Sequence, residues 1–126
     1  MATERLGTKR LTVGAHYGTK DFIVQRVSAV IMAVYTLGLL ISVIFASELN
    51  FETWQHRFTF HWGSVPVGQI LATVVFVSLV WHAWVGIRDI WMDYIHSAGL
   101  RLFFEAASVL WLAGSVVYFV KILWSL

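Results

Sequence analysis

The sequence has no cysteine, one proline and few charged side chains among its 126 residues. Without cysteine, the chain forms no disulfide and offers no thiolate to zinc or an iron–sulfur cluster, nor a thioether attachment for haem. Only 13% of its residues are charged, which is about half the share found in an average soluble protein. The formal net charge of +2 is too small to indicate a nucleic-acid-binding protein.

Apolar residues make up 59% of the chain and aromatic residues 16%. A soluble domain of this length cannot remove so much apolar surface from water. The aromatic content also excludes intrinsic disorder, which requires few aromatic residues and high charge. The expected solvent is therefore lipid, and the expected organisation is a single membrane-anchor domain over residues 1–126.

Three long apolar runs predict three transmembrane helices. A bilayer core of roughly 30 Å requires about 20 helical residues, and apolar runs lie at about residues 27–46, 65–87 and 103–124. The first run is too long, and the segment before it is too long, for a cleaved signal peptide. The expected fold class is all-α, an integral membrane protein, and a soluble helical bundle is the less favoured alternative.

The connection between the first two runs predicts a short helix at the membrane surface. Phe51, Trp54, Phe58 and Trp62 recur at helical spacing, which is the pattern of an interfacial helix. His56 and His61 lie in the same segment. Two histidines can bind a metal ion, but we interpret this pair as solvated surface residues.

Lysine and arginine are distributed unequally around the three runs. Seven of the nine precede the first run or lie between the second and third, whereas Arg57 and Lys121 lie on the other side. By the positive-inside rule the N-terminus faces the cytoplasm. A bacterial inner membrane is the expected location, and a mitochondrial inner membrane is less favoured. The seven residues are Arg5, Lys9, Arg10, Lys20, Arg26, Arg88 and Arg101.

Several polar side chains collect near the cytoplasmic ends of the first two spans. His82 is the only ionisable residue well inside an apolar run, and such a residue is a functional candidate. Arg26 opens the first span in the same leaflet, and Asp93 and Tyr94 follow the second. Gly86 lies one helical turn after His82, where the missing side chain would admit a flat macrocycle. Asp93 is three turns away, roughly 16 Å along the axis, so ligands at His82 and Asp93 would occupy neighbouring sites.

Each of these residues also has a structural interpretation. His82 can hydrogen-bond across a helix interface, and Gly86 can permit close helix packing. Arg26 obeys the positive-inside rule, and Asp93 and Tyr94 suit the membrane interface. The apolar runs contain no second histidine, so a haem with two histidine ligands would require a partner chain.

Two segments carry a family resemblance. Residues 82–94 read HAWVGIRDIWMDY, with ten residues between the histidine and the Asp-Tyr pair, and an apolar third span follows an Arg-Leu pair. Residues 18–35 read GTKDFIVQRVSAVIMAVY and open the first span. Together these segments resemble the membrane-anchor D subunit of succinate dehydrogenase, the succinate:quinone oxidoreductase of respiratory complex II.

The resemblance implies a complex with three other subunits. A second three-helix anchor, of the cytochrome b556 type, packs with this one, and the pair docks an iron–sulfur subunit and a flavoprotein on the cytoplasmic or matrix side. A b-type haem lies between the two anchors, while FAD and the iron–sulfur clusters belong only to the partner subunits. Membrane lipid is a further partner, and nucleic acid is not.

The resemblance also implies roles for individual residues. His82 matches the axial ligand of the haem iron, with the other ligand supplied by the second anchor, and Arg26 matches the arginine near the haem propionates. Tyr94 matches the tyrosine that hydrogen-bonds the ubiquinone carbonyl, and Asp93 is its neighbour. Gly86, placed by helical phase, completes the expected haem-binding set. These side chains suit the chemistry, because imidazole ligates iron, guanidinium pairs with carboxylates and a phenol stabilises a reduced carbonyl oxygen.

The expected function is therefore that of a membrane anchor in succinate:ubiquinone oxidoreductase, an enzyme of the tricarboxylic acid cycle and aerobic electron transport. This chain would contribute to quinone reduction and not to succinate oxidation. The alternatives are a cofactor-free structural anchor and the anchor of fumarate reductase, the related enzyme run in reverse. A small transporter or channel subunit ranks last, because its polar residues would run through the spans rather than cluster at one membrane face.

Overall fold

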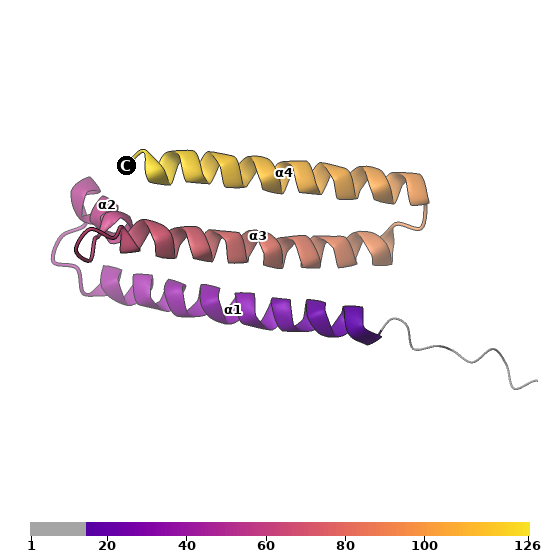
Figure 1. The fold of residues 1–126 in the computed structure, drawn as a ribbon, viewed down its shortest axis with the longest axis horizontal. Coiled ribbons are helices and arrows are strands. Elements are labelled where there is room, and N and C mark those ends of the chain that lie inside the picture. Colours follow the sequence, from indigo (N-terminus) through magenta and orange to yellow (C-terminus); the bar gives the residue numbers. More distant parts are fainter. Residues whose placement is uncertain (1–14) are drawn as a thin grey trace, which may run out of the picture.

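The chain folds into three long helices and one short helix, as a computed structural model describes for residues 15–126. In sequence order they are α1 (Ala15–Ile44), α2 (Phe51–Thr59), α3 (Val67–Tyr94) and α4 (Ala98–Trp124). The long helices lie side by side, with α3 between α1 and α4 (Figure 1). The described residues contain no β-strand, so the all-α prediction is confirmed.

Each long helix is long and apolar enough to cross a bilayer. The candidate spans are Gly18–Ile44, Val67–Tyr94 and Ala98–Trp124, of 27, 28 and 27 residues. At 1.5 Å per residue each is about 40 Å long, which exceeds the roughly 30 Å hydrocarbon core. The helices are longer than the apolar runs of the sequence because charged residues such as Arg88 and Asp89 continue a helix without difficulty. The prediction of three transmembrane helices is confirmed.

Most of the large apolar side chains lie on the outside of this helix layer. Within the described part of the chain, the only buried hydrophobic residues are Ala72, Val85 and Leu123, and Ser28 is the buried polar residue. In water this arrangement would be unstable, because the apolar surface would remain solvated. In lipid, or against another apolar helix, the same surface is not exposed to water, so the free-energy cost of solvating it does not arise.

The predicted short helix between the first two spans is confirmed as α2, but it ends at Thr59, so Trp62 lies beyond it. Its position at the membrane surface stays a prediction. Its N-terminus has a capping box, in which the Asn50 side chain accepts from the Thr53 backbone N–H and Thr53 Oγ1 accepts from the Asn50 N–H. Near its C-terminal end, Arg57 donates to the carbonyl oxygens of Thr53 (2.6 Å) and Ser42 (3.0 Å). The Ser42 carbonyl is among the last four of α1, which have no partner within the helix, so Arg57 also caps α1.

The start of α3 is packed against the end of α2. A Cβ atom added at Gly68 would lie 2.6 Å from the Phe58 carbonyl oxygen and 2.9 Å from the Phe60 ring. The Gly68 N–H also donates to the Phe60 carbonyl oxygen at 2.9 Å. Only glycine permits this approach, because any side chain would displace the backbone that follows α2.

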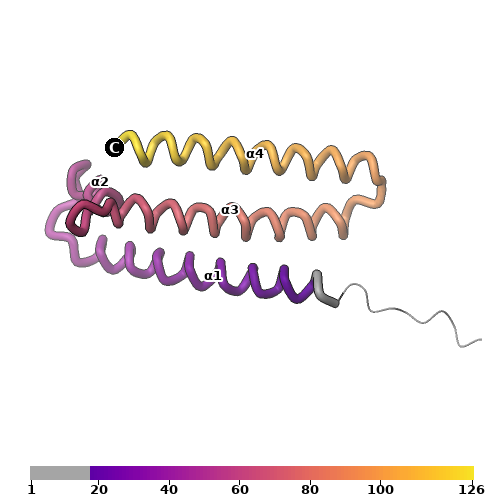
Figure 2. Tube along the Cα trace, in the orientation of Figure 1, coloured from indigo at the N-terminus to yellow at the C-terminus, as the bar shows by residue number. Residues whose placement is uncertain are grey.

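The contact between α3 and α4 combines aromatic stacking with side-chain hydrogen bonds. Phe76 and Phe119 stack with ring centroids 3.9 Å apart. Trp91 Nε1 donates to Ser108 Oγ at 3.0 Å near one end of the layer. A short break between Tyr94 and Ala98 reverses the chain at this end, which Figure 2 shows opposite the end that carries α2 and the C-terminus.

Candidate functional site

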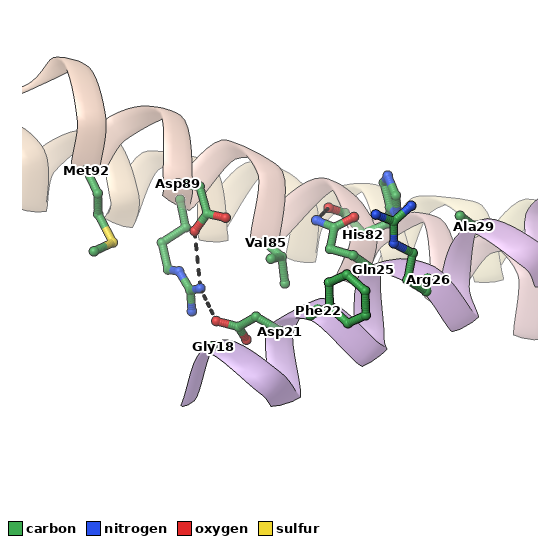
Figure 3. Close-up of a pocket in the computed structure, with 11 residues that line it drawn as sticks. Gly18, Asp21, Phe22, Gln25, Arg26, Ala29, His82, Val85, Asp89 and Met92 are labelled. Atoms are coloured by element: carbon green, nitrogen blue, oxygen red, sulfur yellow. Dashed lines mark hydrogen bonds and ion pairs between the residues drawn. The ribbon is translucent and has the colours of Figure 1, made fainter. Parts of the chain in front are cut away.

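A line of polar residues on α1 faces the second half of α3. Asp21, Gln25 and Ser28 are spaced four and three residues apart, so they share one face of the helix. Opposite them, His82 and Arg88 extend from α3. All five residues form hydrogen bonds or ion pairs within this contact, and Figure 3 shows part of this line along the α1–α3 interface.

Two hydrogen bonds join His82 to α1. Its ring atom Nδ1 lies 3.1 Å from Ser28 Oγ, and its backbone carbonyl oxygen accepts from Gln25 Nε2 at 3.1 Å. Ser28 is only 5% exposed, so its hydroxyl lies inside the helix contact. The imidazole therefore has a defined position between the two helices instead of pointing freely into lipid.

Arg88 forms the charged part of the same interface. Its Nη2 atom lies 2.5 Å from Asp21 Oδ2 on α1 and 3.3 Å from Asp89 Oδ1 on its own helix. The side chains of Arg88 and Asp21 are about one third exposed. Two carboxylates therefore neutralise this guanidinium where α1 and α3 meet, one to two turns from His82.

A groove of about 630 Å³ runs along this interface. Its α1 wall includes Phe22 and Arg26, and its α3 wall includes His82 and Met92. The Arg26 guanidinium carbon lies 4.9 Å above the centroid of the Phe22 ring, a cation–π contact. Arg26 makes no ion pair with any carboxylate of the described chain, because the two acidic residues of the groove are paired with Arg88.

The structure brings three of the five candidate residues to the α1–α3 interface and places the other two, Asp93 and Tyr94, at the end of α3. His82 and Arg26 line the same groove (Figure 3). Asp93 and Tyr94 lie in the last turn of α3, outside this groove, and Tyr94 is 78% exposed. Tyr94 is twelve residues beyond His82, which corresponds to roughly 18 Å along the helix.

Gly86 faces α1 and does not line the groove. The nearest atom to a Cβ added at this glycine would be Gln25 Nε2 at 3.9 Å, an ordinary contact distance. Within this chain Gly86 therefore lies next to the Gln25–His82 hydrogen bond. Its role beside a macrocycle stays a prediction.

A second groove lies at the opposite end of the helix layer. It has a volume of about 590 Å³, and Tyr35, Ser42, His56 and Arg57 are among its lining residues. No group of three or more metal-ligating side chains occurs in the described residues, here or elsewhere. His61 is exposed in the connection that precedes α3.

The charges divide between the two ends of the layer. Lys20, Arg26, Arg88 and Arg101 lie toward the end where α3 stops, whereas Arg57 and Lys121 lie toward the end that carries α2. Arg5, Lys9 and Arg10, on which the predicted orientation also depends, are outside the described residues.

Sequence reasoning missed Asp21, Gln25 and Ser28 as partners of α3. The signal that would have found them is their spacing, since three polar residues on one face of an otherwise apolar span predict a polar helix contact. The sequence marks Arg88 only as a positive-inside residue. Its pairing with Asp21 depends on the register between α1 and α3, which one sequence does not reveal.

Known proteins resemble this chain over nearly its whole length. Residues 2–122 match the family described as the succinate dehydrogenase/fumarate reductase transmembrane subunit. The succinate dehydrogenase hydrophobic membrane anchor subunit of Coxiella burnetii (strain RSA 493 / Nine Mile phase I) is 28% identical over 107 residues, which cover 85% of this chain and 89% of that protein. Three apolar helices and a bacterial membrane-anchor relative together support a multi-pass membrane protein. The chain belongs to the succinate dehydrogenase/fumarate reductase transmembrane subunit family.

Proposed function

We propose that this chain is a D-type anchor of succinate:ubiquinone oxidoreductase, in which His82 is an axial ligand of a b-type haem shared with a second anchor subunit. The observation that carries the proposal is the placement of His82, an imidazole fixed by α1 and lining a groove beside an arginine. Membership of the family supports the anchor role, and the haem and quinone roles rest on this geometry and on the motif of residues 82–94.

The residues of the groove fit a haem. Imidazole is an established iron ligand, and the groove provides one beside the apolar side chains of Phe22 and Val85. The acidic residues of the groove are already paired with Arg88. Arg26 supplies a guanidinium that no carboxylate of the described chain engages, so its donors are free for propionates. When bound, the haem would supply one-electron redox chemistry.

A second anchor subunit is required by this assignment. His82 is the only histidine within the spans Gly18–Ile44, Val67–Tyr94 and Ala98–Trp124. A haem with two histidine ligands therefore takes the other from a neighbouring chain. The apolar outer faces of α1 and α4 provide a surface on which such a chain can pack.

In this proposal Tyr94, with Asp93 beside it, binds ubiquinone. Both side chains are exposed at the end of α3, and the distance along the helix separates them from the haem groove. Reduction places negative charge on a quinone carbonyl oxygen, and a phenol O–H that donates to this oxygen stabilises the reduced forms. Asp93 is placed to orient the phenol or to relay a proton.

The proposed orientation puts this end of the layer at the cytoplasmic face of a bacterial inner membrane, where the iron–sulfur subunit and the flavoprotein dock. Four of the six described lysines and arginines that flank the spans lie toward this end. Electrons from succinate then enter on the side that carries Tyr94. The family includes fumarate reductases, and succinate-dependent reduction of ubiquinone distinguishes the proposed direction.

Replacement of Tyr94 by Phe tests the quinone role. This change removes one hydroxyl from an exposed residue, so we expect ubiquinone reduction by the purified complex to fall by about 10-fold or more, as for loss of a preorganised donor. Succinate oxidation with an artificial dye acceptor should be unchanged, because it does not require the quinone site. Equal loss of the two activities would contradict the proposal, and Tyr118→Phe, an exposed tyrosine on α4, is the matched control.

A further inference from the structure

The Ser28 hydroxyl lies beside the imidazole of His82 and contacts one of its ring nitrogens. Its Oγ atom lies 2.6 Å from the Val24 carbonyl oxygen, 3.2 Å from the Gln25 carbonyl oxygen and 3.1 Å from His82 Nδ1. A serine hydroxyl has one hydrogen to donate and two lone pairs to accept with. The two carbonyl oxygens can only accept, so the hydroxyl hydrogen is donated either to α1 or to His82 Nδ1.

The distances favour donation to α1 itself. The contact with the Val24 carbonyl oxygen is the shortest of the three, and a serine within a helix often donates to the carbonyl four residues earlier. The carbonyl can only accept, so the hydroxyl hydrogen is committed to it. The oxygen of Ser28 is then left as an acceptor, and the group that faces it must be an N–H at Nδ1 of His82.

We infer that Ser28 is a positioning residue that fixes His82 in the Nδ1–H tautomer and leaves Nε2 with a free lone pair. In ligating histidines, the hydrogen bond made by one ring nitrogen determines which nitrogen binds the metal. Here that bond also fixes the rotation of the ring. The inference rests on the proposed function, because it assigns Nε2 to the iron.

The location of Ser28 agrees with this role. It is 5% exposed and lies within the α1–α3 contact, and it is not among the residues that line the groove of His82 and Arg26. His82 itself lines that groove, whereas the Ser28 hydroxyl contacts the imidazole at Nδ1 from α1. Gln25 adds a second contact from α1 by donating to the His82 backbone carbonyl oxygen, which fixes the turn that carries the ring.

Ser28 also influences the electronic properties of a haem held in this way. An acceptor at Nδ1 makes imidazole a stronger electron donor to the metal, and a neutral hydroxyl has a smaller effect than a carboxylate. If Ser28 is replaced by Ala, Nδ1–H loses its acceptor and the ring is free to rotate. We expect a higher haem midpoint potential, because the oxidised iron is less stabilised, and weaker haem retention by about 10-fold or more.

The test uses the whole complex, purified with its partner subunits from cells that carry one variant at a time. The variants are Ser28→Ala, Ser28→Cys, Ser28→Thr and Ser115→Ala. Cysteine keeps the size of the side chain but is a poor acceptor, and threonine restores the hydroxyl. Ser115 is the matched control, because its Oγ also donates to the carbonyl four residues earlier, at 2.9 Å, on α4 and away from His82. The readouts are haem content per complex, the potential from a redox titration and the electron paramagnetic resonance spectrum of the oxidised haem.

We expect the Ala and Cys variants to raise the potential and to lose haem more readily, while the Thr variant and the Ser115 control resemble the original complex. Unchanged potentials and spectra in the Ala and Cys variants would overturn the inference. Failure of both to assemble, with Thr and the control intact, would show a structural role for the hydroxyl and would also overturn it. A parallel His82→Ala complex distinguishes failure of this inference from failure of the proposed function. Full low-spin haem in that complex would refute the proposed function itself.

Discussion

His82 receives its position from α1, although it belongs to α3. Ser28 contacts its ring and Gln25 contacts its backbone, so two hydrogen bonds tie one residue to the neighbouring helix. A histidine that merely projected into lipid would have several rotamers, and a metal would have to order it at an entropic cost. The line of polar residues on α1 therefore orients the imidazole before a ligand binds.

The proposed contact of Arg26 with the haem can be tested by substitutions at this residue. Because its guanidinium has no carboxylate partner in the described chain, we expect Arg26→Gln to weaken haem retention and Arg26→Lys to retain part of it. The measurement is the rate at which haem transfers from the purified complex to an acceptor protein. Arg101→Gln is the control, because Arg101 pairs with Glu105, at 4.0 Å on the same helix, and does not line the groove of His82. Transfer rates that are the same for Arg26→Gln and the control would show that Arg26 makes no contact with the haem.

Gly68 controls the position of α2. An alanine Cβ there would lie well inside contact distance of the Phe58 carbonyl oxygen, so we expect Gly68→Ala to destabilise the complex by about 1–3 kcal/mol, as overpacking does. Thermal unfolding monitored by circular dichroism measures this. Gly99→Ala is the control, since nothing lies within 4 Å of the added atom. Equal stability of the two variants would show that the α2–α3 contact yields without strain.

The elements themselves were predictable from the sequence, but their pairing was not. Long apolar runs specify α1, α3 and α4, and the aromatic spacing of residues 51–58 specifies α2, because these signals are local. The Ser28–His82 contact joins residues 54 positions apart, and it depends on how far α1 is shifted along α3. That shift is set by packing across the interface, including the buried Val85, and no local pattern encodes it.

The candidate site was predictable to a similar extent. An ionisable residue within an apolar run identified His82, and the charge distribution placed Arg26 in the same leaflet. The helical phase put Gly86 beside His82, but phase alone does not tell which neighbour a face meets, and the structure places Gln25 there. Tyr94 follows from the family motif, because an exposed tyrosine at a helix end has no local feature that marks a ligand site.

The described residues form a layer of three long helices with the short α2 at one end, and this layer has its charges toward the ends and apolar surfaces outside. Such a layer is suited to lipid on part of its surface and to a second apolar subunit on the rest. The groove of His82 and Arg26 opens along the α1–α3 interface (Figure 3). Under the proposed function, a haem there would be enclosed only when a second subunit covers the groove, so we expect haem binding and assembly to be coupled.

Because the chain has no cysteine, single introduced cysteines can test the orientation of the layer in the membrane. Single cysteines introduced as Ser47→Cys and Ser97→Cys place one thiol at each end, and both positions are exposed. We expect a membrane-impermeant maleimide to label Ser47→Cys in intact cells with an opened outer membrane, and Ser97→Cys only after detergent is added. The reverse labelling pattern would contradict the proposed cytoplasmic N-terminus.

The reduced-minus-oxidised optical spectrum of the purified complex carrying His82→Ala tests the central claim most directly. We predict that the b-type haem bands of the parent complex are lost or strongly weakened, while the partner subunits still copurify, because the axial imidazole of this chain has been removed. A spectrum with undiminished, fully low-spin haem would show that the iron is ligated entirely by other chains and would contradict the account.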